Sequence, residues 1–148
     1  MAIELQLLRA GDHHVLERVA PDVFDEAIDR EAVRGYLGDP RLHLAVALDD
    51  GVVIGMISAL HYHHPDKPVP ELWINEVGVA PSHRERGVGK ALVAAMFAHG
   101  RQLGCRAAWV LTERSNTPAM RLYASHGGVL ASPETVMLSF SLDEPGAQ

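Results

Sequence analysis

The stretch Arg84-Glu85-Arg86-Gly87-Val88-Gly89-Lys90 joins an apolar run, residues 72–79, to the longest helical pattern of the chain, residues 87–103. At the start of a helix the first N–H groups have no intrahelical acceptor, and the helix dipole favours an anion there. The junction therefore presents backbone N–H groups, that of Val88 among them, to a ligand in front of the helix. This arrangement predicts a phosphate-binding turn.

The residue types in the turn favour the same interpretation. Gly87 and Gly89 carry no Cβ, so a pyrophosphate can approach the backbone closely. Side chains that add positive charge around the turn are Arg84, Arg86 and Lys90.

Two well-known phosphate loops do not fit this stretch. A Walker-type loop requires glycine at the position of Arg84 and Ser or Thr at the position of Ala91. A dinucleotide-binding turn requires a third glycine at the position of Leu92. Neither nucleotide hydrolysis nor NAD binding is therefore supported.

The rest of the chain alternates between strand and helix patterns. Asp49-Asp50-Gly51 between two apolar runs is a strong hairpin signal, because both central residues tolerate positive φ. Strands are expected at residues 3–8, 42–48, 52–60, 72–79, 107–111 and 136–142, and helices from Asp12, at 29–38, at 87–103 and at 117–126. This order predicts an α/β fold, a mixed sheet with helices on both faces, in which the strand–helix–strand unit at 72–111 is parallel.

Composition limits the classes of function. The 148 residues suit one domain, 1–148, and no apolar signal or membrane-spanning run is visible, which favours a cytoplasmic protein. A net charge of −6 argues against nucleic acid as a partner and suits a cationic one. Cys105 is the only cysteine and is expected to be a buried small side chain rather than a catalytic thiol.

Two motifs together resemble the GNAT superfamily of N-acetyltransferases. One is Arg-x-x-Gly-x-Gly at the turn, and the other is the stretch Asn116-Thr117-Pro118-Ala119-Met120-Arg121-Leu122-Tyr123-Ala124-Ser125-His126-Gly127. The resemblance implies a GNAT fold whose central parallel strands splay apart, with acetyl-coenzyme A as co-substrate and its pyrophosphate in the turn.

The resemblance also assigns roles to residues of the strand at 72–79. The free backbone groups of Val77 and Val79 would bind the pantetheine arm as a missing strand would. Gly78 fits this picture, because a glycine inside a strand marks a bulge or a close backbone approach.

Three residues are implied at the reaction centre. Glu76 is the candidate base for the acceptor amine, acting directly, through water or by its charge, and an ordinary paired strand glutamate is the alternative. Tyr123 is the candidate acid for the departing thiolate, or a packing residue that binds the thiol. Asn116 would contact the pantetheine amide and can also cap its helix.

The acceptor is less well defined. The chain resembles, more loosely, type I aminoglycoside 3-N-acetyltransferases, an antibiotic-resistance group. A polycationic aminoglycoside would suit Asp25, Glu26, Asp29 and Glu76, although these acids are equally consistent with a solvated face. The alternatives are acetylation of a protein N-terminus or lysine, and a non-catalytic acyl-coenzyme A-binding module. A homodimer is compatible with the resemblance.

The remaining polar cluster is His61, His63 and His64. A flexible loop at 61–70 accounts for it better than a metal site, because no acidic or cysteine partner has a telling spacing. No metal is expected. Trp73 and Trp109 are expected to pack on the sheet, with an acceptor-site role open for Trp73.

Overall fold

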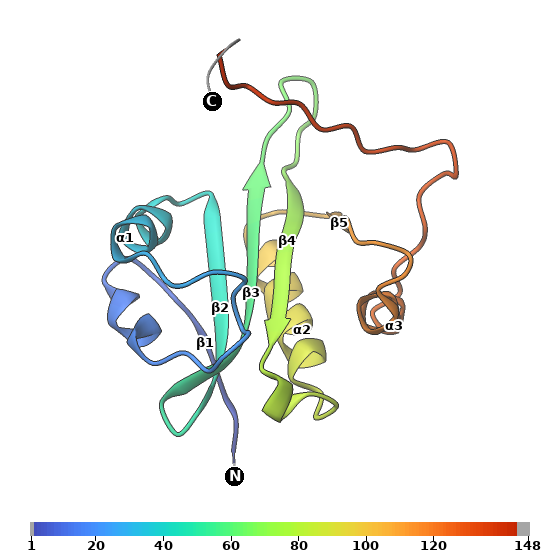
Figure 1. Ribbon diagram of the computed structural model, residues 1–148. Coiled ribbons are helices and arrows are strands. Elements are labelled where there is room, and N and C mark those ends of the chain that lie inside the picture. Colours follow the sequence, from blue (N-terminus) through green and yellow to red (C-terminus); the bar gives the residue numbers. More distant parts are fainter. Residues whose placement is uncertain (1, 145–148) are drawn as a thin grey trace.

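The computed structural model describes residues 2–144. Its strands form one sheet in the order β1-β2-β3-β4-β5, antiparallel throughout except for the parallel pair β4 and β5 (Figure 1). The strands are β1 Glu4–Leu7, β2 Leu42–Asp49, β3 Val52–Tyr62, β4 Glu71–Val79 and β5 Ala108–Val110. The predicted mixed α/β sheet is confirmed.

Helices cover both faces of this sheet (Figure 1). The α-helix α1 and the 3-10 helix η1 pack together beside β2, whereas α2 lies across β2, β3 and β4 on the other face. The helical segments are η1 Asp12–Glu17, α1 Arg30–Gly38, η2 Pro81–His83, α2 Val88–Gln102 and α3 Thr117–Ser125. None of the helices in residues 2–144 is long and apolar enough to cross a membrane.

Helix α2 approaches the sheet closely because glycine stands at two contact points. A Cβ at Gly55 of β3 would lie 2.9 Å from Cγ1 of Val88, and a Cβ at Gly100 would lie 2.9 Å from Cδ2 of Leu72. The largest fully buried side chains of the core are Ile54, Met56, Ile57, Leu72, Leu92, Met96, Val46, Val53 and Val93. This packing fixes the N-terminus of α2 relative to β3 and β4.

The hairpin between β2 and β3 has the predicted conformation. Asp50 and Gly51 have φ values of 49° and 75°, so both residues lie in the left-handed region that this turn requires. Strand β3 is longer than expected, because His61 and Tyr62 still pair with Leu72 and Glu71. The prediction of a loop beginning at His61 was therefore wrong by two residues.

Two other predictions are corrected near the ends of the chain. The helix expected from Asp12 is a short 3-10 helix, and the carboxylate of Asp12 accepts a hydrogen bond from the N–H of Arg9. Residues 136–142 do not form a strand, and Phe140 is 80% exposed. Within residues 2–144, β5 is an edge strand that pairs with β4 alone, and Trp109 is 39% exposed.

A chain of three imidazoles lies on the α2 side of the sheet. Nε2 of His43 is 2.7 Å from Nδ1 of His61, and Nδ1 of His43 is 3.0 Å from Nε2 of His99. Burial, reinforced by the two neighbouring imidazoles, lowers the pKa of His43 to about 4, and burial also lowers the pKa of His61 and of His99. The centre of the chain is therefore neutral in the folded protein at ordinary pH.

This cluster predicts acid sensitivity. The pKa of His43 is lowered from 6.5, so the unfolded chain binds the extra proton first, and stability present above pH 6.5 is lost as the pH falls. We expect His43 alone to contribute a loss of about 2.5 kcal/mol by pH 4.5. Urea unfolding between pH 7 and 4.5 measures this loss of stability. The loss should be smaller in His43→Gln and unchanged in His14→Gln, the control at an exposed histidine. A wild-type stability that does not change over this range would contradict the prediction.

Candidate active site

The predicted phosphate turn has the expected backbone form. Glu85 and Gly87 have positive φ values of 61° and 77°, and α2 begins directly afterwards at Val88. The first hydrogen bond of the helix runs from the N–H of Ala91 to the carbonyl of Gly87, and no side chain caps this end. The three N–H groups of residues 88–90 therefore point out of the helix without an intrahelical acceptor.

The basic side chains of the turn are available to a ligand. Arg84, Arg86 and Lys90 are all exposed. The segment before the turn is held by His83, whose Nε2 donates to Oδ2 of Asp49 at 2.7 Å. Since Asp49 ends β2, this contact ties the approach to the turn to the sheet.

Strands β4 and β5 part next to the turn. Their parallel pairing covers only Leu72↔Ala108, Trp73↔Trp109 and Ile74↔Val110, although β4 continues to Val79. The predicted splay of the central parallel strands is thus present.

The backbone of β4 beyond the splay is directed toward the open side. The N–H of Ala80 donates to Ile54 in β3, and strand alternation then turns the backbone groups of Val79 and Val77 away from β3. Consistent with this, the carbonyl of Val79 accepts a hydrogen bond from Nε of Arg84 at 3.3 Å. Val77 and Val79 lie where a missing strand would pair.

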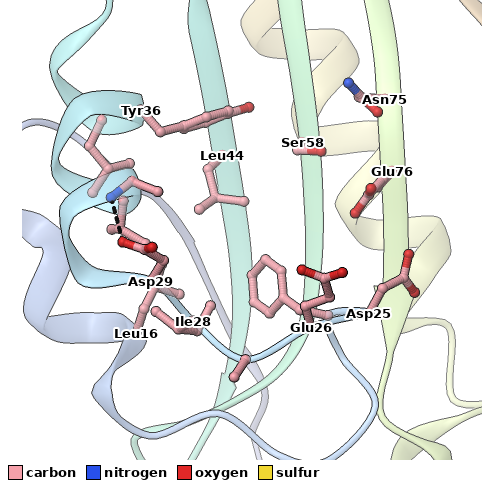
Figure 2. A pocket seen from close by; sticks show the side chains of 15 residues that line it. Leu16, Asp25, Glu26, Ile28, Asp29, Tyr36, Leu44, Ser58, Asn75 and Glu76 are labelled. Carbon is pink, nitrogen blue, oxygen red and sulfur yellow. Dashed lines mark hydrogen bonds between the residues drawn. The ribbon is translucent and has the colours of Figure 1, made fainter. Parts of the chain in front are cut away.

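A cavity of about 520 Å³ lies on the face of the sheet that α2 does not cover (Figure 2). It is bounded by α1, the segment before α1 and strands β2 to β4. Apolar side chains form most of its floor, and Glu76 of β4 stands at its edge. The residues that line it are Leu16, Phe24, Asp25, Glu26, Ala27, Ile28, Asp29, Ala32, Val33, Tyr36, Leu37, Leu44, Ser58, Asn75 and Glu76.

The predicted acceptor acids meet at this cavity. Asp25, Glu26 and Glu76 are exposed and lie on one side of it, with Tyr36 across from them (Figure 2). In residues 2–144 none of the three forms an ion pair with a basic side chain. The fourth acid, Asp29, caps α1 by accepting a hydrogen bond from the N–H of Ala32 at 3.0 Å.

The segment at residues 22–26, which carries Asp25 and Glu26, packs closely on β4. In residues 22–26 the acidic side chains are exposed, whereas Val23 is buried and Phe24 is half-buried. Gly78 makes this possible, because a Cβ at Gly78 would collide with the carbonyl oxygen of Val23. Gly78 therefore marks a close backbone approach, while the bulge in β4 lies opposite Ser58 and Ala59.

Sequence reasoning missed Tyr36 and Ser58 as cavity residues. The hydroxyl of Tyr36 donates to the carbonyl of His43 at 2.7 Å and is 3.3 Å from that of Ala59. Burial raises the pKa of Tyr36 to about 12, and the charge of Glu76 acts in the same direction. No local pattern in the sequence reveals these contacts of Tyr36 with β2 and β3.

Helix α3 carries the other two predicted site residues. Asn116 caps it, accepting a hydrogen bond from the N–H of Ala119 at 3.2 Å. Tyr123 is half-buried, and burial raises the pKa of its hydroxyl. Leu122, next to it, lies over Gly89, where an added Cβ would be 3.5 Å from Leu122 Cδ2. Thus α3 stands against the beginning of α2.

The tryptophans pack on each other beside the splay. The rings of Trp73 and Trp109 stack with centroids 4.8 Å apart, and Nε1 of Trp109 donates to the hydroxyl of Tyr62 at 2.6 Å. Tyr62 in turn donates to Oε2 of Glu71, which His64 also approaches to 3.3 Å. Neither tryptophan lines the cavity. In residues 2–144 no cluster of three or more His, Cys, Asp or Glu side chains suited to a metal is present.

Comparison with known proteins agrees with this geometry. A family model described as the acetyltransferase (GNAT) family matches residues 12–127. The chain belongs to this family. Its fold is also that of a solved aminoglycoside acetyltransferase from an uncultured soil metagenomic sample, with a TM-score of 0.81 and 19% identity over 95% of this chain and 97% of the other.

Curated relatives match this GNAT chain over only part of their length. The aminoglycoside N(6')-acetyltransferase type 1 of Salmonella typhimurium is 34% identical over 90 residues, which are 57% of this chain and 62% of the relative. The aminoalkylphosphonate N-acetyltransferase of the same organism is 32% identical over 104 residues, 66% and 64% of the two chains. Both matches span just under two thirds of the relative. The aminoglycoside relative is named for the 6′ nitrogen, not for the 3-nitrogen of the looser resemblance.

The contact between Gly78 and Val23 yields a prediction. Gly78→Ala should lower the free energy of unfolding by about 2 kcal/mol, because backbone must move to relieve the collision. Chemical denaturation measures the change. Gly35→Ala is the matched control: a Cβ at Gly35 in α1 meets no atom within 4 Å, so the helix should gain about 0.5–1 kcal/mol. Equal effects of the two substitutions would contradict this account.

Proposed function

We propose that the protein transfers an acetyl group from acetyl-coenzyme A to a primary amine of a small cationic molecule. One observation carries this proposal: strand β4 has an acidic cavity on one face and, at its end, an open backbone edge beside the free N–H groups of α2. A donor bound at the open edge and an amine bound in the cavity would meet at Glu76 and Val77.

The residues of the turn fit the coenzyme. The N–H groups of Val88, Gly89 and Lys90, with the exposed side chains of Arg84 and Arg86, would hold a pyrophosphate. The left-handed backbone of Gly87 aims these groups outward.

The remainder of the coenzyme would run along β4. Val77 would offer its backbone groups and Val79 its N–H to the pantetheine amides, whereas the carbonyl of Val79 already accepts from Arg84, and Asn116 would contribute from the start of α3. When bound, the coenzyme supplies an acetyl group activated as a thioester.

The role of Glu76 follows from the charge of the acceptor. An alkyl amine near pKa 10.4 is neutral for only about one part in a thousand at pH 7.4, which opposes attack by ~4 kcal/mol. Glu76 would hold the ammonium with Asp25 and Glu26 and take its proton, directly or through water. The amine nitrogen then forms a bond to the acetyl carbon as the carbon–sulfur bond breaks.

Tyr123 would return a proton to the sulfur. A tyrosine hydroxyl has a pKa near 10.0, and burial raises the pKa of Tyr123 further, so the hydroxyl carries its proton at neutral pH and can donate it.

An aminoglycoside is the acceptor that the cavity and the relatives' names favour. The cavity carries uncompensated acids above an apolar floor, which suits an amino sugar with several ammonium groups. The volume, about 520 Å³, lies in the range of small-molecule sites. Acetylation of a protein N-terminus or lysine is the alternative, which peptide substrates in the same assay would test. A cytoplasmic location would provide the acetyl-coenzyme A.

The proposal is tested by thiol release from acetyl-coenzyme A with a panel of aminoglycosides and simple amines. We expect turnover with at least one polyamine sugar, and Glu76→Gln should lower kcat/KM by at least about 10²-fold. Asp50→Asn, a carboxyl-to-amide change in the exposed hairpin turn, is the matched control and should leave the rate unchanged. Coenzyme binding without turnover of any amine would instead indicate a non-catalytic module.

A second substitution distinguishes protonation of the leaving thiolate from binding of the amine. Tyr123→Phe should lower kcat by about 10²-fold with little change in the KM of the amine, because the hydroxyl would act only as the thiolate leaves. Steady-state kinetics with the best acceptor provide the measurement. A rise in KM with kcat preserved would show that Tyr123 has a binding role and not an acid role.

A further inference from the structure

The face of the sheet that carries the acidic cavity continues past the cavity, toward the end of β3 and the start of β4. Ser58 lines the cavity, and alternate residues of a strand share a face, so Tyr62 of β3 stands on this face too. On β4 the side chain of Leu72 packs against α2, so its neighbours Glu71 and Trp73 point to the cavity side. Tyr62 and Glu71 are also paired across the two strands. These side chains and the cavity therefore share one face of the sheet.

A pair of tryptophans occupies this part of the face. The rings of Trp73 and Trp109 are stacked with an angle of 9° between their planes, and Trp109 is 39% exposed. The hydrogen bond from Nε1 of Trp109 to the hydroxyl of Tyr62 holds the exposed ring in one orientation. An exposed aromatic ring that is already fixed loses little conformational entropy when a ligand packs on it.

A carboxylate stands beside the two rings. Tyr62 and His64 both bond Oε2 of Glu71, and within residues 2–144 the other oxygen, Oε1, accepts no hydrogen bond. The hydrogen bonds with Tyr62 and His64 lower the pKa of Glu71, and the charge of Lys67 acts in the same direction without forming an ion pair in the described part of the chain. Glu71 is therefore ionised at neutral pH, and one of its oxygens is available to a cation.

The distance from this carboxylate to the cavity favours a long ligand. Glu71 opens β4, and Glu76 lies at the edge of the cavity, so the two are roughly 15 Å apart along the strand at about 3.3 Å per residue. Trp73 lies between them in the strand. One amino sugar ring is too short to contact both carboxylates, whereas two or three linked rings can reach from one to the other.

We propose that Trp73, Trp109 and Glu71 form a second acceptor subsite, which binds an additional ammonium-bearing ring of an amino sugar while the ring to be acetylated lies in the acidic cavity. This inference rests on the proposed function. An ammonium group over an indole face is attracted by the π-electrons, and the apolar face of a sugar ring packs on the same surface. The free oxygen of Glu71 adds a negative charge beside the rings.

The second subsite acts on the affinity for the acceptor and not on the chemical step. It touches no reacting atom, because the acetyl group is transferred at the other end of the acceptor, beside Glu76. Loss of the subsite should therefore raise the KM of an acceptor that reaches it and change kcat little. A shorter acceptor should respond much less.

Neamine and kanamycin B test the subsite, because kanamycin B is neamine with one further amino sugar ring. In the thiol-release assay, Trp109→Ala should raise the KM of kanamycin B about tenfold more than the KM of neamine. Glu71→Gln, which still accepts from Tyr62, should give a difference of about threefold that shrinks at high salt. The controls on edge strand β1 are Leu5→Ala, where the side chain is also 39% exposed, and Glu4→Gln, and both should leave the ratio of the two KM values unchanged.

The outcomes separate this inference from the proposed function. If the wild type turns over neither acceptor, the proposed function fails, and calorimetry then measures the same ratio from the Kd values of kanamycin B and neamine. A ratio that neither Trp109→Ala nor Glu71→Gln changes would overturn the second subsite, as would a folded protein that does not bind kanamycin B. Circular dichroism establishes the folding of both variants, and Glu71→Gln decides alone if Trp109→Ala does not fold.

Discussion

Strand β4 pairs along its whole length with β3 but along only part of it with β5, and the rest of the site depends on this difference. It pairs with β3 from Glu71 to Val79 but with β5 only as far as Ile74. Beyond Ile74 the side of β4 that faces away from β3 has no strand partner, and there Nε of Arg84 bonds the carbonyl of Val79 while the backbone of Val77 and the N–H of Val79 pair with no strand. Backbone polar groups need partners, so this edge favours a ligand that can pair with it. Under the proposed function, this open slot next to a helix N-terminus would accommodate an extended ligand with a phosphate end.

The two faces of β4 contact different parts of the site. On one face α2 packs through Gly55 and Gly100, which fixes the start of that helix beside the slot. On the other face the contact of Gly78 with Val23 holds the acidic segment over β4, and Glu76 meets Asp25 and Glu26 at the cavity. Donor and acceptor would thus be placed by a single strand, with the anionic ligand on basic charge and the cationic one on acidic charge.

Local rules in the sequence predicted most of the scaffold. Asp29 and Asn116 cap their helices as residues of their type do, and Asp50-Gly51 forms its hairpin, because each of these choices is made within a few residues. Features that depend on distant partners were not predicted, such as Tyr36 reaching the carbonyls of His43 and Ala59. Residues 136–142 illustrate the limit: their alternation predicts a strand, and in the structure they form none.

The central claim is that the free N–H groups at the start of α2 and the open edge of β4 bind a thioester carrier with a diphosphate. An amide-resolved NMR titration with coenzyme A tests it most directly. The account predicts the largest shifts at the amides of Val88, Gly89 and Lys90, followed by those of Val77 and Val79, and smaller ones at the acidic cavity. Saturable binding with its largest shifts elsewhere, or no binding by the folded protein, would contradict it.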